Sequence, residues 1–261
     1  MTTADALVLG LIQGLTEFLP VSSSGHLVIA QALLRFQGPG IVFDILLHGA
    51  TLGAVVVYFW RDVVALLASL LPGGDVARRR VVGLIILATI PTGVCGLTID
   101  HYLSGLFESE HFAAAMLLVT GLVLLVAEYT RAGTGTMEQL SPVQAVVVGT
   151  AQGVAVLPGI SRSGSTIAAG LMLGMDAQAA ARFSFLMSIP AILAAVALHA
   201  RDLAHSAAAG NNLLPMAAGV AIAFVSGLAA IHLLLKLLAR RKLWPFTLYC
   251  WVVALSVLVL G

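Results

Sequence analysis

A short stretch of the chain combines a carboxylate, three consecutive hydroxyls and an imidazole within otherwise apolar sequence. It runs from Gln13 to His26 and reads QGLTEFLPVSSSGH. Its carboxylate, Glu17, could bind a divalent cation, orient a water molecule or act as a general base. The plainer alternative is a carboxylate that caps local backbone or pairs with an arginine. We predict a functional Glu17, because charges embedded in a membrane seldom serve structure alone.

A second stretch, from Gln152 to Thr166, repeats this plan. It has a Gln-Gly pair, apolar residues, Pro158 and then the sequence GISRSGST. The spacing from the Gln to the matching Gly is twelve positions in both stretches (25 − 13 and 164 − 152). The second stretch supplies Arg162, whose planar guanidinium suits bidentate binding of phosphate. We therefore expect the two stretches to meet in one site.

The hydroxyl groups in both stretches precede apolar segments that are expected to be helical. One serine of the run Ser22, Ser23 and Ser24 is explained as a helix N-cap, but three exceed what one cap requires. Helix N-termini with free N–H groups and hydroxyls bind phosphate. Ser161, Ser163 and Thr166 repeat this arrangement. The predicted ligand is a phosphorylated group with two or more negative charges.

His26 follows Ser23 by three positions, so the two side chains share one helical face. This spacing predicts that His26 accepts the proton of a nucleophilic Ser23 or gives a proton to a leaving group. Two alternatives stay open, namely a water activated by His26 in place of the serine and a histidine that only packs. His48, in the next apolar segment, is equally open between a supporting role and none.

The composition is that of an integral membrane protein. The chain has 261 residues, of which 60% are hydrophobic and 10% charged, and its mean hydropathy is +1.04. Soluble domains carry about 25% charged residues. The net charge of +1 leaves no basic stripe for nucleic acid. Cys95 and Cys250 are interpreted as spectator thiols, and the start of the chain does not read as a signal peptide.

Apolar segments of about 20 residues predict membrane-spanning helices. Six stretches qualify: Ile41–Trp60, Val81–Ile99, Phe112–Thr130, Phe183–Ala200, Leu213–Leu238 and Leu243–Leu260. Two regions are instead broken by proline and serine, and their pieces are Ala4–Phe18 with Leu27–Phe36 and Val143–Leu157 with Thr166–Met175. Broken backbone at membrane depth occurs only where protein or a wet cavity surrounds it. We predict two re-entrant helical hairpins.

The two halves of the chain, residues 1–136 and 137–261, show the same order of segments. Each has a re-entrant hairpin followed by three spans, and an odd number of spans turns the second copy over. The expected fold is therefore one all-α polytopic membrane domain with six transmembrane helices and two re-entrant hairpins in an inverted-topology repeat. Such repeats place their sites near the midplane, where discontinuous helices meet.

The basic residues predict the orientation in the membrane. With the N-terminus outside, the inner loops hold Arg61, Arg78, Arg79, Arg80, Arg131, Lys236, Arg240, Arg241 and Lys242. The outer side then holds Arg35 and Arg201, and the acidic loop Asp100–His111 lies outside as well, in agreement with the positive-inside rule. The first hairpin enters from outside and the second from the cytoplasm. Val63–Leu71 is interpreted as an interfacial continuation of the first span.

At these residues the sequence resembles the undecaprenyl-diphosphatase family, bacterial membrane enzymes associated with bacitracin resistance. The first family motif, which leads into Pro-Val-Ser-Ser-(Ser/Thr)-Gly-His, matches Gln13 to His26. The second, Pro-Gly-x-Ser-Arg-Ser-Gly-x-Thr, matches Pro158 to Thr166. Many members have Glu where this chain has Gln13, which shifts metal binding and acid–base work onto Glu17.

The resemblance implies hydrolysis of undecaprenyl diphosphate to undecaprenyl phosphate and inorganic phosphate, which recycles the lipid carrier for peptidoglycan synthesis. It implies the bacterial inner (plasma) membrane, and we expect a site that opens toward the outer, periplasmic face. Glu17 with Gln13 is the expected holder of Mg²⁺ or Ca²⁺, since both ions prefer oxygen ligands. The expected partners are the lipid substrate and membrane lipids, with a homodimer left open and no nucleic acid. The alternatives are a polyprenyl-phosphate transporter or flippase and a non-catalytic lipid-binding protein.

Overall fold

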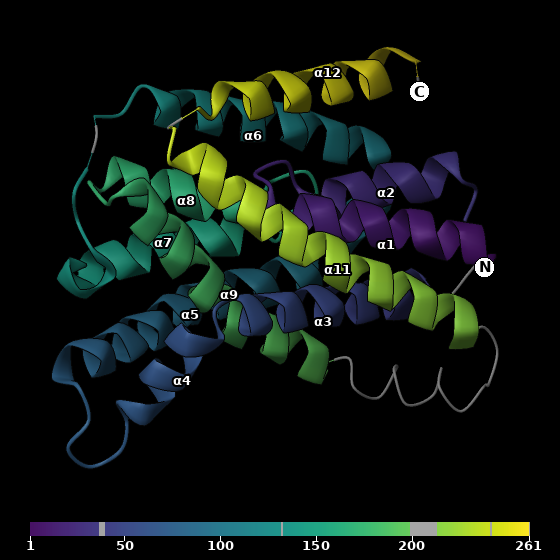
Figure 1. Ribbon diagram of the computed structural model, residues 1–261. Coiled ribbons are helices and arrows are strands. Elements are labelled where there is room, and N and C mark those ends of the chain that lie inside the picture. The colour runs from purple at the N-terminus through teal and green to yellow at the C-terminus, as the bar shows by residue number, and fades with distance from the viewer. Residues whose placement is uncertain (37–39, 132, 199–212, 241, 261) are drawn as a thin grey trace.

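The computed structural model describes residues 1–36, 40–131, 133–198, 213–240 and 242–260 (Figure 1). Within these ranges the chain forms helices and no strand, apart from an isolated bridge between Gly135 and Met175. The helices are α1 (Thr3–Phe18), α2 (Ser23–Leu33), α3 (Gly40–Tyr58), α4 (Trp60–Ala68), α5 (Val76–Leu103), η1 (Ser104–Glu108), α6 (Glu110–Glu128), η2 (Met137–Gln139), α7 (Pro142–Val154), α8 (Arg162–Met172), α9 (Ala177–Leu198), α11 (Leu213–Leu238) and α12 (Trp244–Leu260).

The two broken segments form helical hairpins, α1 with α2 and α7 with α8. Figure 1 shows the first hairpin in the half of the molecule that holds the N-terminus and the second in the opposite half. Their tips touch, because a Cβ atom added to Gly25 would lie 2.8 Å from the Cα atom of Gly159. The second helix of each hairpin begins earlier than predicted, at Ser23 instead of Leu27 and at Arg162 instead of Thr166. The polar residues before those apolar segments are therefore already helical, since Ser22 and Ser161 act as N-caps.

Several helices are long and apolar enough to cross a membrane, as the sequence predicts. Within the described residues, four helices (α5, α6, α9 and α11) each pass this test alone, and counting α3 with α4 as one bent span makes up to 5. α12, with 17 residues, is shorter than these. α4 is a separate helix bent by 76° from α3, so the segment around Val63 does not continue the first span in a straight line.

The expected outer loop Asp100–His111 is largely helical. α5 continues to Leu103, η1 fills Ser104–Glu108, and α6 begins at Glu110, so this connection between two spans consists mostly of helix. The side chain of Ser109 caps α6 by accepting a hydrogen bond from the backbone N–H of Phe112 at 3.2 Å. Sequence polarity marked the segment as exposed, but polarity does not exclude helix where a cap is available.

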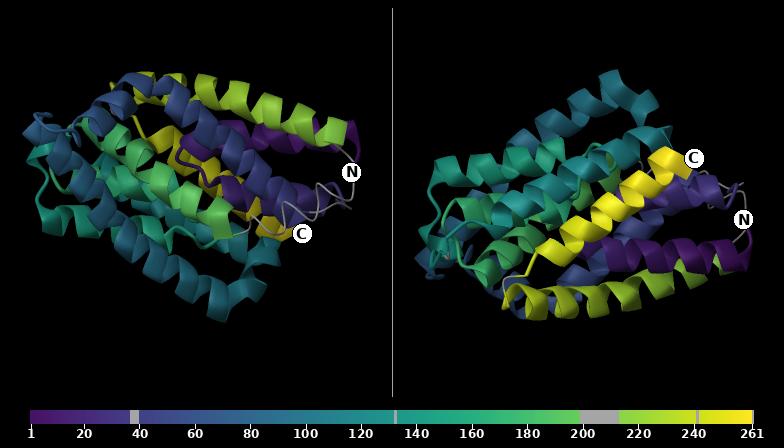
Figure 2. Two further views of the ribbon diagram at one scale, coloured as in Figure 1. Left: turned by 90° about the horizontal axis from the view of Figure 1, so that it is seen from below. Right: turned by 90° about the horizontal axis from the view of Figure 1, so that it is seen from above.

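Small residues let α1 pack closely against α11, which brings the two halves of the chain together. A Cβ atom on Gly10 would lie 2.3 Å from the carbonyl oxygen of Gly219, and one on Gly14 would lie 2.0 Å from Oγ of Ser226. Figure 2 shows α1 and α11 side by side in both views. The first hairpin is thus held against a helix from the second half of the sequence.

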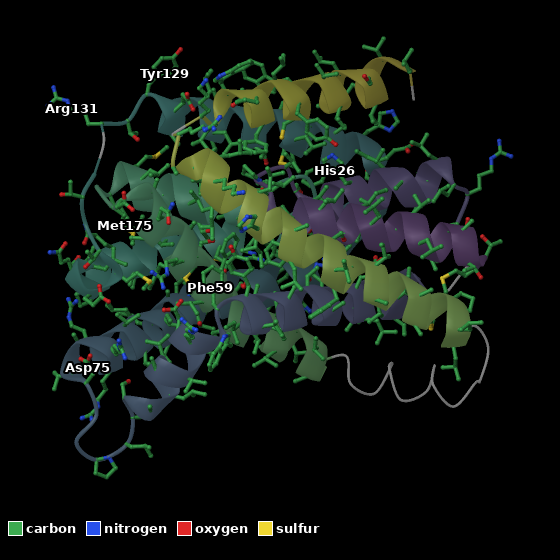
Figure 3. All side chains as sticks on the ribbon, in the orientation of Figure 1. His26, Phe59, Asp75, Tyr129, Arg131 and Met175 are labelled. Carbon is green, nitrogen blue, oxygen red and sulfur yellow. The ribbon has the colours of Figure 1, made fainter. Side chains whose placement is uncertain are left out.

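Arginines near the start of α5 bind backbone carbonyl groups. Arg79 donates to the carbonyl oxygens of Ser69 at 2.9 Å and Leu71 at 3.1 Å, and Arg80 donates to those of Glu138 and Leu140. Figure 3 places Asp75 and Arg131 at the same end of the helix bundle, opposite the N-terminus seen in Figure 1. Arg131 and the segment that follows Asp75, which holds Arg78, Arg79 and Arg80, thus lie at one end, while Arg201 and Arg241 lie outside the described residues.

Candidate functional site

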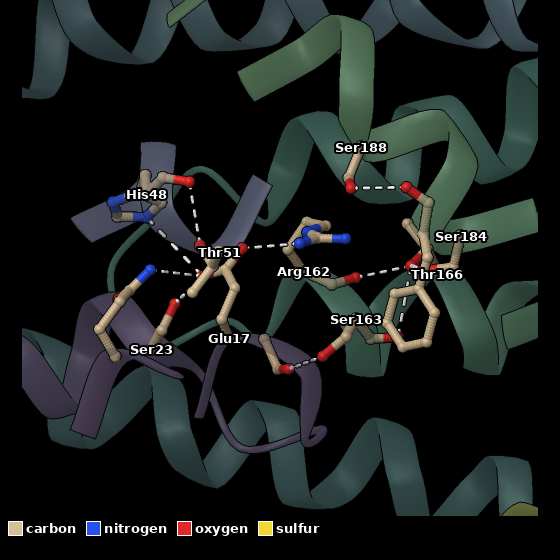
Figure 4. Close-up of polar contacts among 12 residues, drawn as sticks. Glu17, Ser23, His48, Thr51, Arg162, Ser163, Thr166, Ser184 and Ser188 are labelled. Atoms are coloured by element: carbon tan, nitrogen blue, oxygen red, sulfur yellow. Dashed lines mark hydrogen bonds and ion pairs between the residues drawn. The ribbon is translucent and has the colours of Figure 1, made fainter. Parts of the chain in front are cut away.

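Glu17 is the centre of a polar cluster between the tips of the two hairpins (Figure 4). It lies in the last turn of α1, and its side chain is 5% exposed. Its Oε1 accepts a hydrogen bond from Nη2 of Arg162 at 2.6 Å, and its Oε2 accepts one from Oγ of Ser23 at 2.6 Å. The carboxylate, the arginine and the serine of the two motifs therefore meet, as the sequence predicts.

Gln13 and His48 complete the surroundings of this carboxylate. Gln13 lies one helical turn before Glu17, and its Nε2 donates to Oε2 at 3.0 Å. Nε2 of His48, from α3, lies 3.8 Å from the same oxygen, and its Nδ1 lies 2.8 Å from the carbonyl oxygen of Asp44. The sequence did not decide whether His48 has a supporting role, and the structure places it beside Glu17.

The turn between α1 and α2 holds Ser23 in place. Ser22, the N-cap of α2, has a φ of 69° and a ψ of 98°, and its hydroxyl accepts a hydrogen bond from the backbone N–H of Gly25 at 3.3 Å. A positive φ at a serine is unfavourable and occurs mostly where the surrounding structure enforces it. The Ser24 hydroxyl lies 3.4 Å from that of Ser22. Ser23 is thereby the first residue of α2 and points at Glu17.

The second hairpin contributes another helix N-terminus. Ser161 caps α8 by accepting from the backbone N–H of Gly164 at 3.0 Å. The Ser163 hydroxyl donates to the carbonyl oxygen of Leu19 at 3.0 Å, which links the two hairpins. Arg162 is the first residue of α8, so a helix N-terminus and a guanidinium lie together. This arrangement suits an anion.

Thr166 supports α8 behind the site. Its hydroxyl lies 2.7 Å from the carbonyl oxygen of Arg162 and 2.6 Å from the hydroxyl of Ser184 on α9. Thr166 therefore contacts the backbone of Arg162 and a serine from the next helix, and not Glu17 or Ser23. Sequence analysis did not single out Ser184, although it lies in the segment Phe183–Ser188 that follows the second hairpin as Phe43–His48 follows the first.

The spacing in the sequence predicted Ser23 as the partner of His26, but the His26 ring lies against other groups. Its Nδ1 lies 2.7 Å from the carbonyl oxygen of Ser22, and its Nε2 lies 2.9 Å from the hydroxyl of Tyr249 on α12. The Ser23 hydroxyl donates to Glu17 instead. Sequence analysis missed Tyr249, since a single tyrosine in an apolar span gives no pattern that would indicate a role.

Two polar atoms at the site are buried without a hydrogen-bond partner among the described residues. They are Nη1 of Arg162 and Oε1 of Gln13. A buried polar atom left unpaired costs about 1–3 kcal/mol. Nη1 is a charged donor that can bind a phosphate oxygen, and Oε1 is a neutral acceptor that can bind a cation.

The donor atoms at the site fit a hard divalent cation such as Mg²⁺ or Ca²⁺. Gln13 contacts the Glu17 carboxylate through Nε2, its Oε1 is unpaired, and both ions prefer amide and carboxylate oxygen ligands. Within the described part of the chain, no group of three or more His, Cys, Asp or Glu residues could hold a metal ion. Phosphate oxygens and water would therefore supply the remaining ligands, as is usual for magnesium.

Comparison with known proteins identifies the family of the chain. A model of the family "Bacitracin resistance protein BacA" matches residues 6–256. The chain is 45% identical to a protein from Syntrophotalea carbinolica over 96% of both chains, and 43% identical to one from Desulfatibacillum aliphaticivorans over 98% of this chain and 97% of the relative. It is 40% identical to a protein from Carboxydothermus hydrogenoformans over 100% of this chain and 98% of the relative. All three relatives are named undecaprenyl-diphosphatase. The resemblance carried by the two motifs is confirmed, and the chain belongs to the bacitracin resistance protein BacA family.

Proposed function

We propose that this protein is an undecaprenyl-diphosphatase of the membrane, which hydrolyses undecaprenyl diphosphate to undecaprenyl phosphate and inorganic phosphate. The observation that carries the proposal is the contact of Glu17 with both Ser23 and Arg162 at the tips of two helical hairpins. The names of relatives that match this chain over nearly its whole length state the same activity. The product would return to peptidoglycan synthesis as lipid carrier, and the family name associates this activity with bacitracin resistance.

Arg162 and the two helix N-termini bind the diphosphate in this proposal. The guanidinium uses Nη2 for Glu17 and keeps Nη1 free for a phosphate oxygen. The N-terminal residues of α2 and α8, with the hydroxyls of Ser22, Ser24 and Ser161, add further donors around the same space, while Ser163 links the two hairpins through the Leu19 carbonyl group. These groups also offset the negative charge that grows on the phosphate oxygens during phosphoryl transfer.

Ser23 is the proposed nucleophile and Glu17 its base. As Oγ of Ser23 attacks the terminal phosphorus, its proton passes to Oε2 of Glu17, the bond to the bridging oxygen breaks, and undecaprenyl phosphate leaves. Water then hydrolyses the phosphoserine, releases phosphate and restores the serine. The hydrogen bond of 2.6 Å between the two side chains supports this route. The rival is a water activated by His26, whose two ring nitrogens lie against Ser22 and Tyr249 in this structure.

Glu17 and Gln13 would hold Mg²⁺ or Ca²⁺ at the site. Such an ion supplies positive charge that stabilises the phosphate oxygens of the substrate. The remaining groups act through this chain alone: Arg162 orients the phosphate, and the hairpin turn orients Ser23. Thr166 holds the first turn of α8 through its contact with the Arg162 carbonyl group.

The proposed arrangement in the membrane has six transmembrane helices and two re-entrant hairpins in an inverted-topology repeat with halves 1–136 and 137–261. Support comes from the hairpins, which occupy opposite halves of the molecule in Figure 1, and from Arg131 and the segment of Arg78, Arg79 and Arg80, which lie at one end. The protein is then a multi-pass protein of the bacterial inner membrane whose site opens toward the outer face. A homodimer stays a prediction.

A transporter or flippase of polyprenyl phosphates is the second function considered, because inverted repeats are common in transporters. A hydroxyl hydrogen-bonded to a buried carboxylate favours hydrolysis, since transport needs no nucleophile. The names of the relatives also state a diphosphatase.

The decisive experiment measures phosphate release from undecaprenyl diphosphate by the purified protein in detergent, where transport cannot contribute. We expect release by the wild-type chain, and Ser23→Ala should remove nearly all of it. Ser256→Ala is the matched control and should release phosphate at the wild-type rate, because the hydroxyl of this exposed serine donates to the carbonyl oxygen of Val252 on its own helix, α12. Absence of release by a folded wild-type protein with Mg²⁺ or Ca²⁺ would refute the hydrolase. A substantial rate in Ser23→Ala would instead favour the water activated by His26.

A further inference from the structure

We propose that Tyr249 is a positioning residue of the active site, which acts through His26 on the strained turn that presents Ser23. This inference rests on the proposed function, because it concerns the alignment of the nucleophile. The hydrogen bond joins His26 to Tyr249, two residues that lie 223 positions apart in the sequence. Tyr249 lies on α12, and it is the one residue of that helix named in the site described above.

The hydrogen bonds of His26 define its protonation pattern. The partner of Nδ1, at 2.7 Å, is the carbonyl oxygen of Ser22, which can only accept, so Nδ1 carries a hydrogen. In the neutral ring Nε2 is then an acceptor, and the Tyr249 hydroxyl at 2.9 Å donates to it. The two rings are within 8° of parallel. Tyr249 therefore favours the Nδ1–H tautomer and fixes the orientation of the imidazole.

That tautomer holds the turn before Ser23. Ser22 has a φ of 69°, which is costly for a serine. Its carbonyl oxygen accepts two hydrogen bonds from His26, one from the backbone N–H at 3.2 Å and one from Nδ1. The opposite tautomer would place a lone pair of Nδ1 against that carbonyl oxygen, and the second bond would be lost. The direction of the Ser23 hydroxyl toward Glu17 depends on this turn.

The two residues that follow Tyr249 fix the position of α12 in the bundle. Cys250 is fully buried in a cluster with Val21 and Ile29 of the first hairpin. Nε1 of Trp251 donates to the carbonyl oxygen of Leu118 on α6 at 3.1 Å. These contacts fix the position of α12, and the hydrogen bond to His26 orients the partly exposed Tyr249 side chain.

The proposal predicts a loss in turnover without a loss in substrate binding. Tyr249→Phe keeps the ring and removes the hydroxyl, so His26 can adopt either tautomer. Partners that orient a metal-binding histidine through a hydrogen bond typically contribute 10-fold to 100-fold, and we use this range as the guide here. We expect kcat to fall by about tenfold or more. KM should change little, because Arg162 and the helix N-termini keep their geometry.

A second tyrosine–histidine pair gives a matched control. The Tyr58 hydroxyl lies 3.1 Å from Nδ1 of His232, and this pair joins α3 to α11 with no contact to Glu17 or Ser23. The experiment compares the wild type, Tyr249→Phe and Tyr58→Phe in detergent by phosphate release and by ¹⁵N NMR of histidine-labelled protein, with His26→Gln used to assign the signals. We expect the Nδ1–H form of His26 in the wild type and in Tyr58→Phe, and a mixture of tautomers in Tyr249→Phe.

Two results would overturn the proposal. One is a wild-type His26 in the Nε2–H form, which needs no variant and no activity to observe. The other is a folded Tyr249→Phe protein with wild-type kcat and an unchanged His26 tautomer. Because the NMR readout is independent of turnover, a failure of this inference is distinguishable from a failure of the diphosphatase activity. If Tyr249→Phe did not fold, the wild-type spectrum would still decide.

Discussion

At the scale of single residues, one carboxylate organises the site. Glu17 is buried, and its two oxygens contact side chains from both hairpins, namely Arg162 at Oε1 and Ser23 at Oε2. A buried charge is tolerated only with a partner of opposite charge and with hydrogen bonds. The same contacts make the carboxylate a base for the serine and align the arginine for phosphate. Structural and chemical demands on this residue therefore coincide.

Glu17→Gln should abolish most phosphate release, because an amide cannot accept the serine proton. Loss of a general base typically costs 10²-fold to 10⁴-fold in rate, and we expect a loss of about this size. Asp62→Asn is the control, since it also neutralises a carboxylate bonded to an arginine, here Arg182 at 2.8 Å, but at a half-buried position outside the site. The measurement is phosphate release with saturating Mg²⁺ or Ca²⁺. Retention of most of the wild-type rate in Glu17→Gln would contradict both the base and the metal-anchor assignments.

At the scale of elements, the function depends on how closely the two hairpin tips approach each other. Gly25 and Gly159 lie in contact, and the carbonyl oxygen of Gly159 accepts a hydrogen bond from Thr120 on α6 at 2.8 Å. Each tip ends in a helix N-terminus that carries site residues. The distance between Ser23 and Arg162 is thus set by backbone contacts that leave no room for a side chain.

Gly159→Ala should destabilise the protein and lower its activity. Gly159 has a φ of 93°, and an added Cβ atom would lie 2.1 Å from the carbonyl oxygen of Ala113. Such strain costs about 1–3 kcal/mol, and relief of the clash would move the second tip away from Glu17. Gly93→Ala in α5 is the control, because its Cβ atom meets nothing within 4 Å and alanine favours helix. Thermal unfolding in detergent and phosphate release test both variants, and equal behaviour of the two would refute the role assigned to Gly159.

At the scale of the whole molecule, the hairpins occupy opposite halves of a bundle, and Arg131 and the segment of Arg78, Arg79 and Arg80 lie at one end of it. α1 from the first half of the sequence packs along α11 from the second half, so the two halves of the chain share this helix contact. This arrangement agrees with the inverted-topology repeat that we propose. It places the charged cluster between the ends of the bundle, where lipid would otherwise reject it.

The orientation can be measured with single cysteines in a chain that carries Cys95→Ser. His111→Cys, an exposed position at the start of α6, should react with an impermeant thiol reagent in intact cells, and Ala77→Cys, an exposed position near Arg79, should react only after the cells are opened. The reason is the excess of arginines around Ala77, which favours the cytoplasmic side. The reverse labelling pattern would contradict the proposed topology.

The sequence by itself determined the class of protein, the breaks in two apolar segments and the residues of the central contact. These are local properties. Apolar length indicates helices that cross a membrane, and proline with serine ends a helix and caps the next. The pairing of Glu17 with Arg162 was also foreseeable, because the two motifs share a spacing and carry opposite charges.

Only the tertiary structure decided which groups are partners within that cluster. Spacing along one helix suggested His26 for Ser23, whereas the hydroxyl donates to Glu17 and the imidazole to the Ser22 carbonyl group. Tyr249 reaches His26 only because α12 is fixed against α6 and the first hairpin. The direction of a side chain depends on its rotamer and on neighbours from distant parts of the chain, and neither is encoded in local spacing.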